Sequence, residues 1–200
     1  QQGRWAYGAT DVLLSRLKLI ARCKRSLLKR LELSLFLLQY LPLALTLAGA
    51  MALGAVSLVY GVDPFKSYWQ LGLVWMLISV VYVASFIDSN MRRGRSALSS
   101  LINLGRISAA TIAASPEVSL GILKALFRVK VQYRRTPKGA FEERGEHSRI
   151  PLELLFLTMF VCLGTLLIAR STLLTGGWLL FYSVGYLYTA IRWLRDLFID

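Results

Sequence analysis

Three residues at the start of the chain, Gln1, Arg4 and Trp5, combine side chains that can hold a sugar phosphate. The flat indole face of Trp5 is a surface on which the axial C–H groups of a pyranose ring can pack. Arg4 is permanently charged, and its planar guanidinium pairs with phosphate oxygens. Gln1 can bond a sugar hydroxyl or a neighbouring backbone group. The alternative interpretation of Trp5 is an aromatic belt residue at a membrane surface.

A second group of residues suited to phosphate lies in a charged stretch at 133–139, Tyr-Arg-Arg-Thr-Pro-Lys-Gly. The two segments resemble the Gln-x-x-Arg-Trp acceptor motif and the Phe-x-Val-Thr-x-Lys-Gly gating-loop motif of processive, membrane-embedded family 2 glycosyltransferases, the cellulose-synthase-like enzymes. Their positions relative to the apolar runs also resemble that family. The chain departs from the second motif with Arg135 in place of Val and with Pro137 inside it.

The resemblance implies a role for each motif residue. Gln1 and Trp5 would bind the acceptor, and Arg4 and Lys138 would bind the diphosphate of a nucleotide sugar. A gating loop that swings over the bound nucleotide would contain Tyr133, Arg135, Thr136 and Lys138. The alternative for this loop is a basic juxtamembrane segment that binds lipid.

The donor-binding chemistry of that family has no counterpart in this sequence. Such enzymes hold a divalent ion with an Asp-x-Asp motif and take their base from a separate acidic motif, and Asp88-Ser89-Asn90 is not an Asp-x-Asp. We therefore expect no catalytic residue and no metal site in this chain. The catalytic α/β domain would be absent from it, and Mg²⁺ or Mn²⁺ would be held outside it in the complete enzyme.

The chain of 200 residues is 56% apolar, above the roughly half that is usual for soluble domains. Apolar runs of about 20 residues are long enough to cross about 30 Å of hydrocarbon as helices. We predict an all-α membrane protein with four transmembrane helices, and a soluble helical bundle is the less economical alternative. In the first run, which is longer than a bilayer needs, Pro42 is the expected kink. The four predicted spans are Leu33–Tyr60, Tyr68–Ile87, Ile150–Ala169 and Leu173–Leu194.

The distribution of charge predicts the orientation. All of the 24 basic residues except Lys66 and Arg170 lie before the first span, between the second and third spans, or in the tail from the end of the fourth span onward (Arg192 and Arg195). By the positive-inside rule these segments are cytosolic, so both termini are expected to face the cytosol from a plasma (inner) membrane. The net charge of +13 could suggest nucleic acid, but attraction to anionic headgroups explains the spread of basic residues more simply.

About three amphipathic interfacial helices should accompany the spans. Asp11 to Leu31 has an apolar and a basic face, and residues 91–113 and 116–130 form an apolar, basic pair separated by Ser115-Pro116-Glu117, which reads as a helix start. The predicted segments are 1–31 (acceptor motif and interfacial helix), 32–88 (first two spans), 89–149 (interfacial helices and gating-type loop) and 150–200 (last two spans).

The sequence therefore predicts the channel and acceptor-binding part of a membrane glycosyltransferase that transfers sugar to a growing polysaccharide or glycolipid and passes it across the membrane. Expected partners are the bilayer, a catalytic domain or partner chain, a UDP-sugar and the acceptor, and no nucleic acid. By itself this chain should not turn over substrate. The alternative is a non-catalytic four-helix subunit or scaffold of a larger complex, derived from such an enzyme. A fragment, a split gene product and a true small subunit all fit the sequence.

Overall fold

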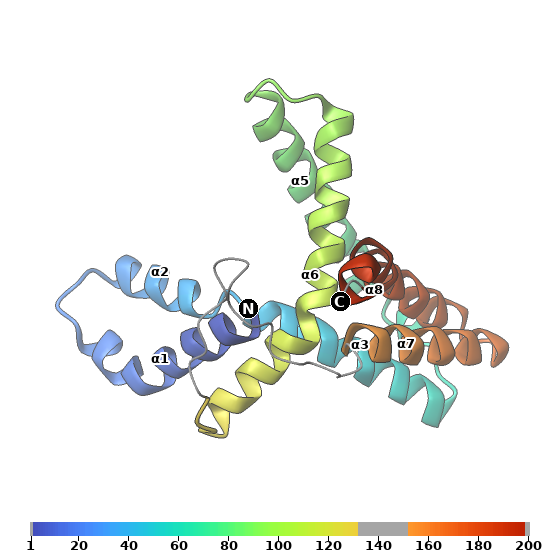
Figure 1. The fold of residues 1–200 in the computed structure, drawn as a ribbon, viewed down its shortest axis with the longest axis horizontal. Helices are drawn as coiled ribbons and strands as arrows, with labels where there is room; N and C mark the ends of the chain where they lie inside the picture. The colour runs from blue at the N-terminus through green and yellow to red at the C-terminus, as the bar shows by residue number, and fades with distance from the viewer. Residues whose placement is uncertain (1, 132–151, 199–200) are drawn as a thin grey trace. The chain divides into compact units, whose positions relative to one another are not determined.

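A computed structural model describes residues 2–131 and 152–198, and in these residues the chain forms eight α-helices (Figure 1). They divide into two compact units. Described residues up to Ala48 and from Ala114 to Leu152 form the first unit, and those from Gly49 to Ala113 and from Glu153 onward form the second. The helices are α1 (Gln2–Arg22), α2 (Leu27–Leu37), α3 (Leu41–Tyr60), α4 (Pro64–Ser67), α5 (Trp69–Met91), α6 (Ala97–Leu126), α7 (Leu152–Ala169) and α8 (Leu173–Phe198).

The first unit begins with a helical hairpin of α1 and α2, where one continuous helix over Asp11–Leu31 was predicted (Figure 1). That prediction is wrong because Arg30 stabilises the end of α1. Its Nη1 donates to the carbonyl oxygen of Ala21 at 2.6 Å, and its Nε donates to that of Arg25 at 3.0 Å. A cation at the carboxyl end of a helix satisfies free carbonyls and complements the helix dipole, which favours a helix end here.

The first predicted span is interrupted just before Pro42, the residue at which a kink was expected. Helix α2 ends at Leu37, and α3 begins at Leu41, so Pro42 lies in the first turn of α3. In that turn an N–H has no helical partner in any case, and the fixed φ of proline suits the helix. The predicted first span therefore loses its first residues to α2.

Three described helices are long and apolar enough to cross a membrane: α3, α5 and α6. The first two correspond to predicted spans. Leu154–Ala169 in α7 is apolar but shorter, and α8 is helical where the fourth span was predicted. The all-helical prediction is thus confirmed for the described residues, whereas the count of four spans stays a prediction.

Residues 97–126 contain one continuous helix, α6, with Pro116 inside it. The prediction of two helices that meet at Ser115-Pro116 is therefore wrong. Proline removes one helical N–H, but packing can outweigh this local signal. Ser115 and Val118 on either side of Pro116 are 0% and 1% exposed, so the helix continues through a well-packed segment.

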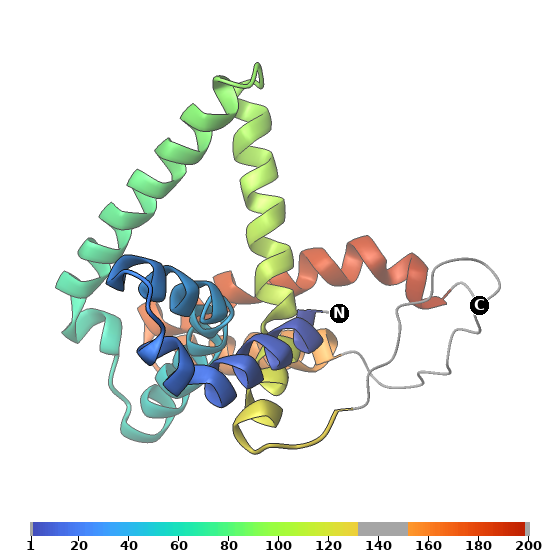
Figure 2. The same cartoon turned by 90° about the vertical axis from the view of Figure 1, so that its left-hand side faces the viewer.

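In the second unit, α3, α7 and α8 approach closely at glycines. A Cβ on Gly54 would lie 2.5 Å from Leu163 Cδ2, and a Cβ on Gly176 would lie 2.7 Å from the Gly164 carbonyl oxygen. The core around these contacts is apolar and aromatic. Helix α5, by contrast, contains no buried residue, and it diverges from the first part of α6 after the turn that joins them (Figure 2). The largest buried side chains of this core are Tyr186, Phe160, Leu167 and Leu179.

Candidate functional site

Residues 2–5 of the first predicted motif lie on the first turns of α1, which cross the last part of α6 at very short range. A Cβ on Gly3 would lie 2.6 Å from the carbonyl oxygen of Glu117, and a Cβ on Gly121 would overlap the carbonyl oxygen of Gly3. The Glu117 carboxylate also lies here, with Oε2 3.3 Å from the Gly3 Cβ position. An acidic group beside the start of a helix complements the positive end of its dipole.

Apolar packing holds this crossing together. Ala6 is 0% exposed, one turn after Gly3, and it packs with Val118 and Ile122 of α6, which are 1% and 6% exposed. Half-buried side chains from the start of α3 and the residue before it complete the cluster. The motif helix is thus fixed on two sides, by α6 and by residues Tyr40, Leu43 and Ala44.

Arg4 and Trp5 follow Gly3 directly but differ in their exposure. Arg4 is half-buried, whereas Trp5 is 51% exposed. Because successive residues of an α-helix are about 100° apart, the two side chains leave α1 in different directions. The Trp5 indole therefore has a free surface for a ligand or for lipid, while Arg4 lies closer to the packed part of the unit.

Trp5 belongs to an exposed apolar row on α1. Val12 and Leu19 follow at intervals of seven residues, on nearly the same side of the helix, and they are 46% and 62% exposed. Lys18 and Arg22 are exposed on a neighbouring side of the helix. An apolar row beside basic residues is typical of a helix that lies in the headgroup region, so this row bears on the membrane-anchor interpretation of Trp5.

Five predicted site residues have no place in this geometry. Gln1, Tyr133, Arg135, Thr136 and Lys138 lie outside the described residues. The structure therefore brings together the Arg4–Trp5 segment and the end of α6, and it says nothing of the gating-type loop.

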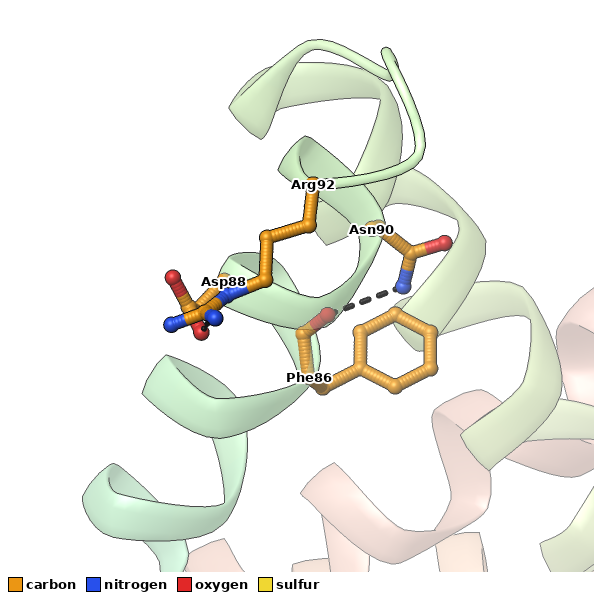
Figure 3. A network of polar contacts seen from close by, with 4 residues as sticks. All are labelled: Phe86, Asp88, Asn90 and Arg92. Carbon is orange, nitrogen blue, oxygen red and sulfur yellow. Dashed lines mark hydrogen bonds and ion pairs between the residues drawn. The ribbon is translucent and has the colours of Figure 1, made fainter.

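The polar residues at the end of α5 are arranged as a helix end (Figure 3). Arg92 Nε donates to Asp88 Oδ2 at 2.9 Å, and Asn90 Nδ2 donates to the Phe86 carbonyl oxygen at 2.9 Å. Gly94 then adopts a positive φ of +80°, a conformation readily available to glycine, in the turn toward α6. Among the described residues no three His, Cys, Asp or Glu side chains could share a metal ion.

One polar site that the sequence did not reveal joins the two short loops of the second unit. Asp63 occupies the N-cap position of α4 but makes no side-chain bond to that helix. Its Oδ2 instead accepts from the Leu174 backbone N–H at 2.9 Å, and its Oδ1 accepts from the Thr175 hydroxyl at 2.8 Å. Asp63 thus caps the start of α8, a partnership between residues more than a hundred positions apart that no local pattern signals.

The close crossing of α1 and α6 was also missed by sequence reasoning. Gly3 occupies a variable position of the Gln-x-x-Arg-Trp pattern, and Gly121 lies within a predicted helix. The available signal was glycine itself, because glycine inside a helix costs about 1 kcal/mol relative to alanine and often marks a close approach.

Comparison with known proteins gives one informative match. No protein-family model matches the chain, and no solved structure matches it. A protein from Sulfolobus acidocaldarius named "Probable glycosyltransferase" is 32% identical over 199 residues, which cover 98% of this chain. The chain spans 42% of the length of that relative. Over nearly its whole length the chain is therefore related to part of a protein that is named as a glycosyltransferase.

Proposed function

We propose that this chain is the channel and acceptor-binding part of a processive, inverting family 2 glycosyltransferase of the cellulose-synthase-like kind. The similarity over 98% of the chain to a protein named "Probable glycosyltransferase" carries the proposal. The enzyme would take a UDP-sugar on the cytosolic face of the plasma membrane and extend a polysaccharide or glycolipid that passes outward. Mg²⁺ or Mn²⁺ and the catalytic base would be supplied by residues outside this chain.

The geometry of the first motif supports an acceptor site on α1. Trp5 presents an exposed aromatic face on a helix whose first turns are fixed by packing on α6. A rigid helix holds a ligand-binding side chain more accurately than a loop does. Arg4, half-buried on the same turn, would contribute a fixed positive charge to a diphosphate.

The long apolar helices support a location in the membrane. Helices α3, α5 and α6 are long and apolar enough to cross it. The described basic side chains of α1 and α2 are largely exposed, which suits a cytosolic face in contact with anionic lipid. The gating loop with Tyr133, Arg135, Thr136 and Lys138 would complete the donor side.

The proposal is tested with membranes that contain the natural full-length protein carrying this chain. They are incubated with Mg²⁺ or Mn²⁺ and, one at a time, with radiolabelled UDP-glucose and UDP-N-acetylglucosamine. We expect label in a membrane-bound or precipitable product from one donor, and loss of that product in a Lys138→Ala variant. A Lys130→Ala variant, which changes a basic residue outside the motif, is the control. If neither donor gives a labelled product, although the protein is present and correctly assembled, the result would favour the non-catalytic subunit.

A further inference from the structure

We propose that Gly3 and Gly121 are positioning residues, which hold α1 at the short distance from α6 that sets the location of Arg4 and Trp5. This inference rests on the proposed function for what the two side chains bind. The contact itself does not depend on that function, and it can be tested without any substrate.

The two glycines meet backbone to backbone. A Cβ on Gly121 would overlap the Gly3 carbonyl oxygen and come within 2.9 Å of the Gly3 carbonyl carbon. From the other helix, a Cβ on Gly3 would lie 2.6 Å from the Glu117 carbonyl oxygen. Backbone atoms cannot rotate out of the way as the end of a side chain can, so any larger residue must push the two helices apart.

The surroundings of the contact are closed. Gly121 is buried, and Val118 and Ala125 on the same helix are each 1% exposed. Ala6 is 0% exposed on the opposite helix. A displaced helix would therefore open a void beside these side chains instead of sliding into free space, and interiors packed at crystal density resist such a change.

The displacement would be carried directly to the motif. Arg4 and Trp5 follow Gly3 within the same helical turn, so they move with its backbone. A misplacement of about 1 Å in a binding group can lower a catalysed rate by roughly 100-fold. The small size of both glycines is thus a requirement of the site and not only of folding.

The chain supplies matched controls. Gly8 lies on α1 and Gly105 on α6, and a Cβ on either would meet nothing within 4 Å. Substituting alanine at these positions changes the same residue type on the same two helices without touching the crossing. Alanine is also the better helix former, so both controls should retain a native structure.

The test follows the accessibility of α1 in membranes that contain the full-length protein. Single cysteines are introduced as Trp5→Cys or Ala6→Cys after Cys23 and Cys162 have been changed to serine, and their reaction with a water-soluble maleimide is timed. In the otherwise natural protein the cysteine at 5 should react and that at 6 should be protected. Gly121→Ala should raise the reaction rate at position 6 by about tenfold or more, while Gly8→Ala and Gly105→Ala should leave it unchanged.

Sugar transfer provides the second readout. In Gly121→Ala we expect the KM for the acceptor and the KM for the UDP-sugar to rise, or kcat to fall, by roughly 10- to 100-fold, because Trp5 and Arg4 move together with the backbone of Gly3. Unchanged accessibility at position 6 in Gly121→Ala and also in the bulkier Gly121→Val would overturn the inference. If the unsubstituted protein transfers no sugar, the proposed function fails, whereas the accessibility result still decides whether the two glycines position α1.

Discussion

The carboxylate of Asp63 bridges to the start of α8 and accepts a hydrogen bond of 2.8 Å from the Thr175 hydroxyl. The same carboxylate accepts a hydrogen bond from the backbone N–H of Leu174. This N–H lies in the first turn of α8, where backbone N–H groups have no carbonyl acceptor within the helix. Thr172, just before α8, donates its hydroxyl to the Leu167 carbonyl oxygen instead of capping the helix. The loop before α4 therefore does the capping that the local sequence of α8 does not.

Replacing Asp63 with alanine should destabilise the second unit. The loss of a helix cap costs about 1 kcal/mol, within a range of roughly 0.5 to 2. We expect the detergent-extracted Asp63→Ala protein to lose monodispersity at a lower temperature than the unsubstituted protein. Because the two side chains are directly bonded, Asp63→Ala and Thr175→Val should be non-additive in a double-mutant cycle. Lys66→Ala is the control, because it changes an exposed residue of α4, and it should leave the transition temperature unchanged.

Adjacent glycines of α8 should respond oppositely to alanine. A Cβ on Gly176 would lie 2.7 Å from the Gly164 carbonyl oxygen and 3.0 Å from the Ile168 backbone nitrogen, whereas one on Gly177 would meet nothing within 4 Å. Gly176→Ala should therefore cost roughly 1 to 3 kcal/mol through overpacking, and Gly177→Ala should be neutral or slightly stabilising. Thermal unfolding of the two variants measures this, and equal transitions would contradict the close approach of α7 and α8.

The Trp5 side chain should be needed for its ring and not merely for its apolar surface. If it stacks on a sugar, Trp5→Phe should retain most sugar transfer and Trp5→Leu should lose about 2- to 10-fold, since an aromatic contact is worth roughly 0.5 to 1.5 kcal/mol. If the row with Val12 and Leu19 only anchors α1 in lipid, the leucine variant should match the phenylalanine variant. Val12→Ala serves as the matched change within that row. Initial rates of label incorporation distinguish the two roles.

Arg30 should be required for the α1–α2 hairpin. Its guanidinium bonds the carbonyl oxygens of Ala21 and Arg25, and hydrogen bonds to charged groups contribute about 1.5 to 3 kcal/mol when protected from water. Arg30 is half-buried, so we expect a smaller local effect, of about 1 kcal/mol. Arg30→Met should increase proteolytic cleavage between the two helices. Lys29→Met, at an exposed neighbour that loses the same charge, should not.

Helix content could be predicted from apolar runs, but the ends of the helices depended on packing and side-chain contacts that a local pattern does not show. Pro42 was predicted to kink one long helix, whereas it lies in the first turn of α3, where the local backbone geometry of proline suits a helix. Pro116 was misinterpreted because its neighbours Ser115 and Val118 are buried, and that packing is invisible in a local pattern. The break after Arg22 was missed for a similar reason, since it depends on Arg30 from the next helix.

The candidate site could be predicted only in part. The motif residues Arg4 and Trp5 were identified from their resemblance to a family motif, and they lie on one turn of α1. What holds that turn in place, the contact of Gly3 with Gly121, depends on the distance between two backbones. Spacing along a single sequence contains no information on that distance. Gly3 and Gly121, which support the motif without binding a ligand themselves, were therefore overlooked.

The absence of any buried residue in α5 has a consequence for how this protein varies among species. In the proposed membrane location α5 faces lipid, and a helix in contact with lipid is selected for its overall apolar character, because no neighbour requires a particular side-chain shape. Relatives should therefore exchange Leu, Ile, Val and Met freely along α5 while α8, with Tyr182 and Tyr186 buried at 3% and 0% exposure, keeps its residues. In an alignment of orthologues, α5 should be the fastest-diverging of the long helices and still the most constant in hydropathy.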